Sequence, residues 1–204
     1  MKLEFLKRNS RGYTLVELAI VLVIIGLIIT GVLKGQTLIE NAKYKRLRKQ
    51  IDEYATAVYT YFDKYGMYPG DDPRATTRFS GTRNGNGNGY IDGGYCTGAN
   101  EESCRLWQHL RLAGIIGGDT TETNPARVVP RHVYGGQLDI FSYTTAGITG
   151  QVWIALRNVP GDIAKRIDED IDDGQADSGS AICYSGCSGS DYPTTGFVAI
   201  WFKY

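Results

Sequence analysis

The spacing of hydrophobic positions changes from one segment of the chain to the next. From Tyr13 to Leu33 nearly every residue is apolar, and Glu17 is the one charged residue in the run. A helix of this length, rising about 1.5 Å per residue, reaches roughly 30 Å and crosses the hydrocarbon core of a bilayer. The run therefore predicts a transmembrane helix with a carboxylate near its start.

Beyond Leu33, apolar residues recur every three or four positions, as on one face of an amphipathic helix. They are Leu38, Ile39, Ala42, Leu47, Ile51, Tyr54, Ala55, Val58, Tyr59, Phe62 and Tyr65. No proline interrupts the sequence before Pro69. We therefore predict one helix from about Thr14 to Lys64, capped by Gly66, whose second half packs on a sheet.

The remainder of the chain predicts an α+β fold. Three segments are rich in β-branched and aromatic residues and bounded by glycine or proline, as strands are: 137–143, 151–157 and 196–203. A short helix is predicted at 105–112 and another from Pro160 to Gly174, where three isoleucines share one face. Three or four antiparallel strands are expected to cover the long helix.

The charge balance differs between the whole chain and its first residues. The chain contains 22 Lys and Arg and 22 Asp and Glu, so it has no surplus of positive charge. This balance gives no reason to expect a nucleic-acid partner. The first twelve residues are basic, which predicts that they stay cytoplasmic and that the chain after Leu33 is exported. No small-residue cleavage site of the A-x-A kind follows the apolar run, so an ordinary secretory signal is not expected.

Glu17 is the unusual residue of the apolar run. A carboxylate inside a membrane helix is costly unless it is protonated or paired, although one at the membrane edge can extend into the headgroups. Residues 11–17, RGYTLVE, resemble the processing motif of type IV prepilins and of type II secretion pseudopilins. That motif has a short basic leader ending in glycine, an aromatic residue, and Glu at the fifth position of the mature chain.

The resemblance implies a defined chemistry for three residues. A prepilin peptidase would cut between Gly12 and Tyr13 and methylate the new terminal amine, and Glu17 would pair with that amine on a neighbouring subunit in a filament. The sequence departs from the common pattern because Tyr13 replaces Phe and because the first helix has no proline. Any bend on assembly would then occur at the glycines at 26, 31 and 35.

The resemblance also predicts how the chain is divided and where it is found. We expect a cleaved leader at 1–12, a transmembrane or filament-core helix at 13–34, the amphipathic half of the same helix at 35–65, and a globular pilin-like α+β head at 66–204. The protein would cross the inner membrane once with its head in the periplasm and then enter a pilus or pseudopilus filament.

A glycine-rich loop in the head has the spacing of a calcium-binding loop. Asn84, Asn86, Asn88 and Asp92 stand at positions 1, 3, 5 and 9, with glycine at the sixth position and isoleucine at the eighth. Amides replace most of the usual carboxylates, and Tyr95 stands where an EF-hand loop has Glu. A weak calcium site and a metal-free turn both remain open. Three nearby carboxylates could complete such a site: Asp71, Asp72 and Glu101.

Two charged clusters also permit more than one interpretation. The acidic residues at 168, 170, 172, 173 and 177 suggest either a second cation site or the solvated face of a helix. The basic run at 43–49 suggests a solvated face, a contact with anionic lipid, or a contact with acidic patches of neighbouring subunits.

The four cysteines predict two disulfides, because the domain is expected to be exported. Four cysteines allow three pairings, and the local choice is Cys96 with Cys104 and Cys183 with Cys187. Zinc binding is disfavoured because no histidine lies at ligand spacing.

The sequence gives little support for catalysis. His109 and His132 stand alone, and no serine lies in a G-x-S-x-G elbow. We therefore expect a structural subunit of a type IV pilus or type II secretion pseudopilus and no enzyme. Its expected partners are the prepilin peptidase, copies of itself or other pilins, and the inner-membrane assembly platform. The alternatives are a low-abundance minor pilin at the filament tip that acts as an adhesin or binding module, and an enzyme that uses the helix only as an anchor.

Overall fold

The computed structural model describes residues 12–145 and 148–204, so most of the predicted leader lies outside the described residues. The elements in order along the sequence are α1 (Leu15–Tyr65), α2 (Ala75–Arg78), α3 (Glu102–Leu112), α4 (Pro125–Val128), β1 (Leu138–Thr145), β2 (Ile148–Pro160), α5 (Gly161–Ile171), β3 (Ala181–Ser185) and β4 (Phe197–Lys203). The protein forms two compact units that divide between Ala42 and Lys43. Helix α1 belongs to both.

The single long helix is confirmed. It ends at Tyr65, and Gly66 follows with a φ of 73° while its N–H donates to the carbonyl of Phe62 at 2.7 Å. Such a left-handed glycine ends many helices because it carries no Cβ. The glycines at 26, 31 and 35 lie inside the helix.

The first unit contains the apolar half of α1. Its large apolar side chains between Leu15 and Leu33 are 46 to 86% exposed. Two threonine hydroxyls donate to the carbonyl four residues earlier: Thr30 to Gly26 at 2.9 Å and Thr37 to Leu33 at 3.3 Å. A helix whose polar groups are satisfied internally suits a bilayer, which offers no hydrogen bonds. Among the described residues, α1 is long and apolar enough to cross one.

The second unit is built on a four-stranded antiparallel sheet in the order β1-β2-β4-β3. Three of its strands match the predicted ones, and β3 is an addition. Together with α1, this sheet gives the predicted class, an α+β fold with a long N-terminal helix on a small antiparallel sheet.

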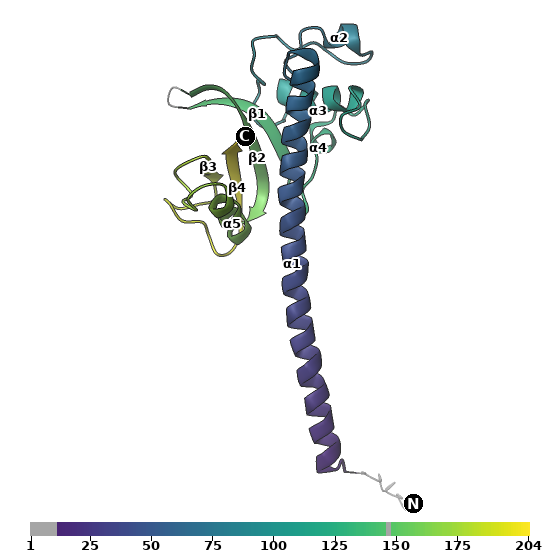
Figure 1. The fold of residues 1–204 in the computed structure, drawn as a ribbon, viewed down its shortest axis with the longest axis vertical. Coiled ribbons are helices and arrows are strands. Elements are labelled where there is room, and N and C mark those ends of the chain that lie inside the picture. The colour runs from purple at the N-terminus through teal and green to yellow at the C-terminus, as the bar shows by residue number, and fades with distance from the viewer. Residues whose placement is uncertain (1–11, 146–147) are drawn as a thin grey trace, which may run out of the picture. The chain divides into compact units, whose positions relative to one another are not determined.

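Alternation along the strands gives the sheet two apolar faces. On β2, the residues at 152, 154 and 156 join the main core, whereas Trp153 and Ala155 belong to a smaller cluster on the other face. The main core also takes a stripe of α1, whose C-terminal half lies beside the sheet (Figure 1). The stripe consists of Tyr44, Leu47, Ile51, Ala55, Val58 and Tyr61.

The smaller cluster is mostly aromatic: it contains Phe141, Trp153 and Trp201, and Tyr95 packs against it. Trp201 on β4 donates its Nε1 hydrogen to the hydroxyl of Tyr95 at 2.6 Å, and its ring stacks on Tyr184 at 4.0 Å. Trp153 and Trp201 are 2% and 5% exposed, and Trp107 of α3 is completely buried in the main core. All three tryptophans of the protein therefore lie inside the head.

Helix α5 packs through the face that the isoleucine spacing predicts. Ile163 and Ile167 are buried in the main core, and Ile171 packs at its edge. The hydroxyl of Tyr44 on α1 donates to the carbonyl of Arg166 at 3.2 Å and also contacts the carboxylate of Asp170. These bonds tie α5 to the head half of α1.

Candidate functional site

Gly12 and Tyr13 lie directly before α1, at the predicted processing position. Both are exposed, and the side chain of Tyr13 is 82% accessible. A Cβ placed on Gly12 would meet no atom within 4 Å. The fold therefore does not itself require glycine at this position, so any requirement must come from a partner that reads the segment.

Glu17 takes part in a capping box at the first turn of α1. Its Oε2 accepts hydrogen bonds from the backbone N–H of Thr14 at 2.8 Å and from the Thr14 hydroxyl at 2.9 Å. In return, the Glu17 N–H donates to the Thr14 hydroxyl oxygen at 3.2 Å. This reciprocal arrangement satisfies N–H groups that the start of a helix leaves unpaired. The box was not predicted from the sequence, although T-x-x-E at 14–17 is its signal.

The glycine-rich loop folds around Asp71, a carboxylate far from it in sequence. Oδ1 of Asp71 accepts the N–H groups of Gly87 at 2.6 Å and Asn88 at 3.0 Å, and Oδ2 accepts that of Gly89 at 2.9 Å. The Asp71 side chain is completely buried, and this burial raises its pKa, against the pull of the three donors. Asp71 is therefore the centre of the loop.

Three of the four predicted calcium ligands lie together. The side-chain NH₂ groups of Asn86 and Asn88 each donate to Oδ2 of Asp92 at 2.8 Å. Their own oxygens accept backbone N–H groups, from Asn88 at 2.9 Å and from Tyr90 at 2.8 Å. Amide hydrogens thus approach Asp92 where a calcium loop would place a cation. The calcium site stays a prediction.

The side chains of Asn84, Asp72 and Glu101 make their hydrogen bonds to other partners. The Asn84 side chain accepts the N–H of Thr76 at 2.9 Å. Asp72 binds the hydroxyl of Tyr61 and the guanidinium of Arg78, and Glu101 accepts N–H groups of the 97–98 turn.

Glu102, which was not singled out from the sequence, accepts N–H groups from Asn86 at 2.8 Å and Asp92 at 3.1 Å. Its contribution depends on contacts between segments distant in sequence, which local spacing does not reveal.

The acidic cluster spans the last turn of α5 and the loop that follows it, and its side chains bind groups of that region. Carboxylate oxygens of Asp168, Asp172 and Asp173 lie within 4.8 Å of one another. Asp168 is buried and accepts the hydroxyl of Tyr192 at 2.8 Å. Asp172 accepts the N–H of Ser180, and Asp173 accepts that of the residue at 175 at 2.8 Å. Each of the three carboxylates therefore has a partner in the fold.

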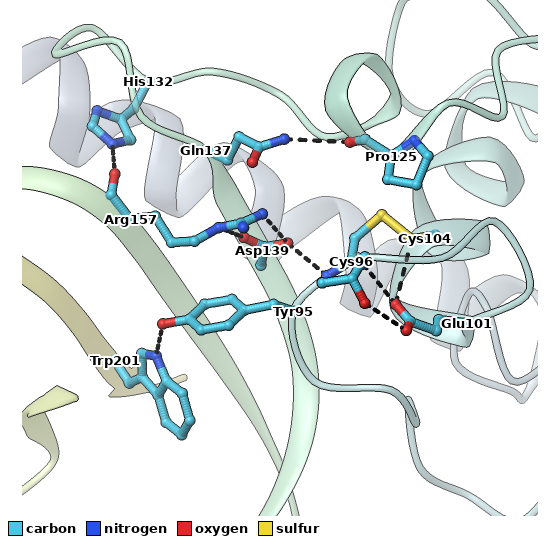
Figure 2. A network of polar contacts seen from close by, with 11 residues as sticks. Tyr95, Cys96, Glu101, Cys104, Pro125, His132, Gln137, Asp139, Arg157 and Trp201 are labelled. Atoms are coloured by element: carbon cyan, nitrogen blue, oxygen red, sulfur yellow. Dashed lines mark hydrogen bonds and ion pairs between the residues drawn. A yellow bond between two sulfur atoms is a disulfide. The ribbon is translucent and has the colours of Figure 1, made fainter. Parts of the chain in front are cut away.

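Both predicted disulfides, Cys96–Cys104 and Cys183–Cys187, are present. The first is fastened to the sheet by a buried ion pair, shown in Figure 2. Asp139 on β1 accepts the N–H of Cys96 at 3.0 Å and the Nε–H of Arg157 at 2.8 Å. Because Asp139 is completely buried, its two donors compensate a charge that would otherwise be costly.

Both histidines are buried and hold turns in place. His109 accepts the N–H of Gly70 through Nδ1 at 2.9 Å, and its Nε2 lies 3.0 Å from the carbonyl of Arg83. Burial lowers the pKa of His109 to about 4, so the ring is neutral at pH 7. Nε2 of His132 contacts the carbonyl of Arg157 at 2.8 Å. His109 is completely buried.

Comparison with known proteins identifies the N-terminal segment. The family model of the prokaryotic N-terminal methylation motif matches residues 7–33. This is the type IV prepilin and pseudopilin signature. The prepilin signature includes Gly12, the Thr14–Glu17 capping box and the exposed apolar run. No curated protein and no solved structure matches the sequence.

The matched segment is a small part of the chain, residues 7–33. It supports membership of the type IV pilin or pseudopilin family, which is structural rather than catalytic. It also implies processing by a prepilin peptidase and assembly with other pilins. The exposed apolar helix fits a membrane-anchored pilin, and the long helix on a small antiparallel sheet is a pilin-like fold.

Proposed function

We propose that the protein is a structural subunit of a type IV pilus or a type II secretion pseudopilus. The leader at 1–12 is removed, the helix at 13–34 anchors the subunit and later forms the filament core, and the helical half at 35–65 supports the head at 66–204. The observation that carries this proposal is the exposed apolar half of α1, most of which lies within the matched methylation motif. Such a surface requires a bilayer or other apolar helices around it.

Processing after Gly12 would change the charge at the start of α1. The new ammonium would stand on Tyr13, directly before the helix cap that Thr14 and Glu17 form. Oε2 of Glu17 receives both Thr14 bonds, and Oε1 receives no hydrogen bond from the described residues. Oε1 therefore remains available to the ammonium of a neighbouring subunit. In a low-dielectric filament core, an unpaired charge is costly and a matched pair is tolerated, so pairing fixes the axial register.

The head would contribute contacts on the filament surface. Tyr44 and Leu47 face the core, whereas Lys45, Arg46 and Lys49 are exposed on the opposite side of α1. These cations point away from the head that carries them. We expect them to contact acidic patches of neighbouring subunits or anionic headgroups.

Processing is tested by mass spectrometry of the mature N-terminus in the native host. The wild-type protein should begin with a methylated Tyr13, and Gly12→Val should remain full length in the membrane. Gly26→Ala is the matched control, because a Cβ at either glycine meets nothing within 4 Å. A wild-type protein that kept residues 1–12 would contradict the proposal and favour an anchored domain.

Assembly is tested by two variants that separate charge from helix capping. Glu17→Gln keeps an oxygen for Thr14 but removes the charge, so it should be processed and fail to enter filaments. Thr14→Val removes the capping hydroxyl and keeps the carboxylate, so it should still assemble. Normal filaments from Glu17→Gln, seen by electron microscopy, would overturn the pairing. Subunit counts in sheared wild-type filaments distinguish an abundant shaft subunit from a rare tip subunit.

A further inference from the structure

The loop at 84–89 repeats Asn-Gly three times, and this dipeptide is chemically fragile. The backbone nitrogen of the glycine can attack the Cγ of the preceding asparagine, because glycine has no Cβ in the way. A new bond forms between this nitrogen and Cγ, the bond from Cγ to the amide Nδ2 breaks, and ammonia leaves a succinimide. Water then opens the ring to Asp or isoAsp, so the net reaction consumes one water and releases one ammonia.

The fold requires glycine at these positions, so the glycine of each fragile pair cannot be exchanged for a residue with a Cβ. A Cβ on Gly85 would lie 2.2 Å from the carbonyl carbon of Asp71, and one on Gly87 would lie 2.9 Å from the ring of Pro73. Gly87 and Gly89 have φ values of 73° and 88°, which other residues rarely adopt. Asn86 and Asn88 are exposed, so water for the hydrolysis is at hand.

Asp71 engages two of the attacking nitrogens. The N–H of Gly87 donates to its Oδ1 at 2.6 Å and that of Gly89 to its Oδ2 at 2.9 Å. To react, a nitrogen must turn toward Cγ, and a hydrogen bond to a buried carboxylate that is itself held in place opposes this turn. The nitrogen of Gly85 is held differently, because it donates to the backbone carbonyl of Asp72 at 2.9 Å.

We propose that Asn86 and Asn88 are deamidation sites that the buried carboxylate of Asp71 protects in the folded head. Deamidation then proceeds through loop openings, at a rate set by how often Gly87 and Gly89 leave Asp71. The product matters to the fold because each side-chain amide donates to Asp92 at 2.8 Å. A carboxylate in the same place is an acceptor beside an acceptor, so deamidation loosens the loop.

The test measures deamidation at each asparagine in the full-length protein in detergent micelles. Samples are aged at neutral pH, and peptide mass spectrometry reads the gain of one mass unit and the isoAsp content at positions 84, 86 and 88. Asn86 and Asn88 should react more slowly in the folded wild type than in the denatured protein. Asp71→Asn, which can offer only one acceptor oxygen, should accelerate both by about tenfold. Asn84 should change little, because a backbone carbonyl holds Gly85.

Two control variants distinguish protection from general unfolding. Asp72→Asn disturbs the neighbouring contacts with Tyr61 and Arg78 but leaves both oxygens of Asp71 in place. Asp92→Asn frees the asparagine side chains without releasing the glycine nitrogens. Neither should match Asp71→Asn at positions 86 and 88. The proposal is overturned if Asp71→Asn leaves these rates unchanged, if all three asparagines accelerate equally, or if the folded wild type reacts as fast as the denatured protein.

Discussion

The two halves of α1 share one helical backbone and differ in what surrounds their side chains. In the half before Lys43, no residue from Leu15 to Leu33 is buried, and Leu33 itself is 59% exposed. In the half after Ala42, a stripe with the spacing of one helix face is 0 to 4% exposed: Tyr44, Leu47, Ile51, Ala55, Val58 and Tyr61. The head therefore buries the apolar face of the second half within the same molecule.

The difference shows that hydrophobicity alone does not determine what a helix packs against. The apolar half carries large aliphatic residues on every side, so no single face could satisfy it. The head half alternates charged and apolar residues, and its apolar stripe fits one sheet. A helix that is apolar on every side is stable when lipid or a bundle of other helices surrounds it. A helix with one apolar stripe needs a single packing partner.

The largest difference in stability is expected when one leucine is truncated in each half of α1. Leu47→Ala removes a completely buried side chain and should lower the free energy of unfolding of the head by about 2–5 kcal/mol. Leu33→Ala, its matched control, should leave head stability unchanged, because its side chain is exposed. Chemical denaturation of the full-length protein in micelles measures both, and equal losses would contradict the division.

Acid should weaken the head half through His109, whose ring stacks beside Tyr61 of α1 at 6.2 Å. Its pKa falls from 6.5 in the unfolded state to about 4 in the fold. Between these values the unfolded state binds the extra proton, so stability is lost as the pH falls from about 6.5 to about 4. The loss should reach about 3 kcal/mol.

His109→Gln is the matched variant, because glutamine can still accept from Gly70 and donate to the Arg83 carbonyl. Its unfolding free energy should depend less on pH over the same window. Burial also lowers the pKa of His132, so this histidine should preserve part of the pH dependence of stability. Identical pH profiles for the two proteins would show that His109 is not the sensor.

Removing the buried Cys96–Cys104 disulfide should cost less stability than either change above. Replacing Cys96 and Cys104 by alanine frees a short loop in the unfolded state and should lower head stability by about 2 kcal/mol. Reducing agent should add little to this loss in the double variant if Cys183–Cys187 contributes through a still shorter loop. Thermal unfolding of the wild type and the double variant, with and without reductant, shows which disulfide contributes more to stability.

The smallest effect is expected at the exposed ion pair of Lys49 with Glu53, whose charged atoms lie 3.3 Å apart. Both side chains are more than half exposed, so water and salt screen the pair. Lys49→Ala should change head stability by about 0.3 kcal/mol. A loss as large as that of Leu47→Ala would mean that this face of α1 is covered in the isolated protein.

The sequence predicted the elements with strong periodicity. The bounds of α1 followed from its unbroken apolar pattern and from Gly66, and three strands and two helices followed from their composition. Strand β3 was missed because Ala181–Ser185 is short and mixes cysteine and serine with its few apolar residues. Helices α2 and α4 are single turns with no period to detect.

The sites were predictable only where their chemistry is local. The motif at 11–17 and the two disulfides depend on near neighbours in the sequence, and spacing revealed them. Asp71 lies sixteen or more positions before the glycines that it binds. Asp139 lies 43 positions after Cys96, whose disulfide it fastens. Contacts of this kind arise only when the sheet and α3 bring separate segments together.

The placement of the tryptophans gives the head its own optical signal. Trp107, Trp153 and Trp201 are all enclosed there, and the anchor contains no tryptophan. Tryptophan fluorescence, excited where tyrosine absorbs little, will therefore report on the head alone, whether the subunit lies in a micelle, in a lipid vesicle or in a polymer. Because Trp201 stacks on Tyr184 and binds Tyr95, emission should shift when the outer face of the sheet opens, before the main core does.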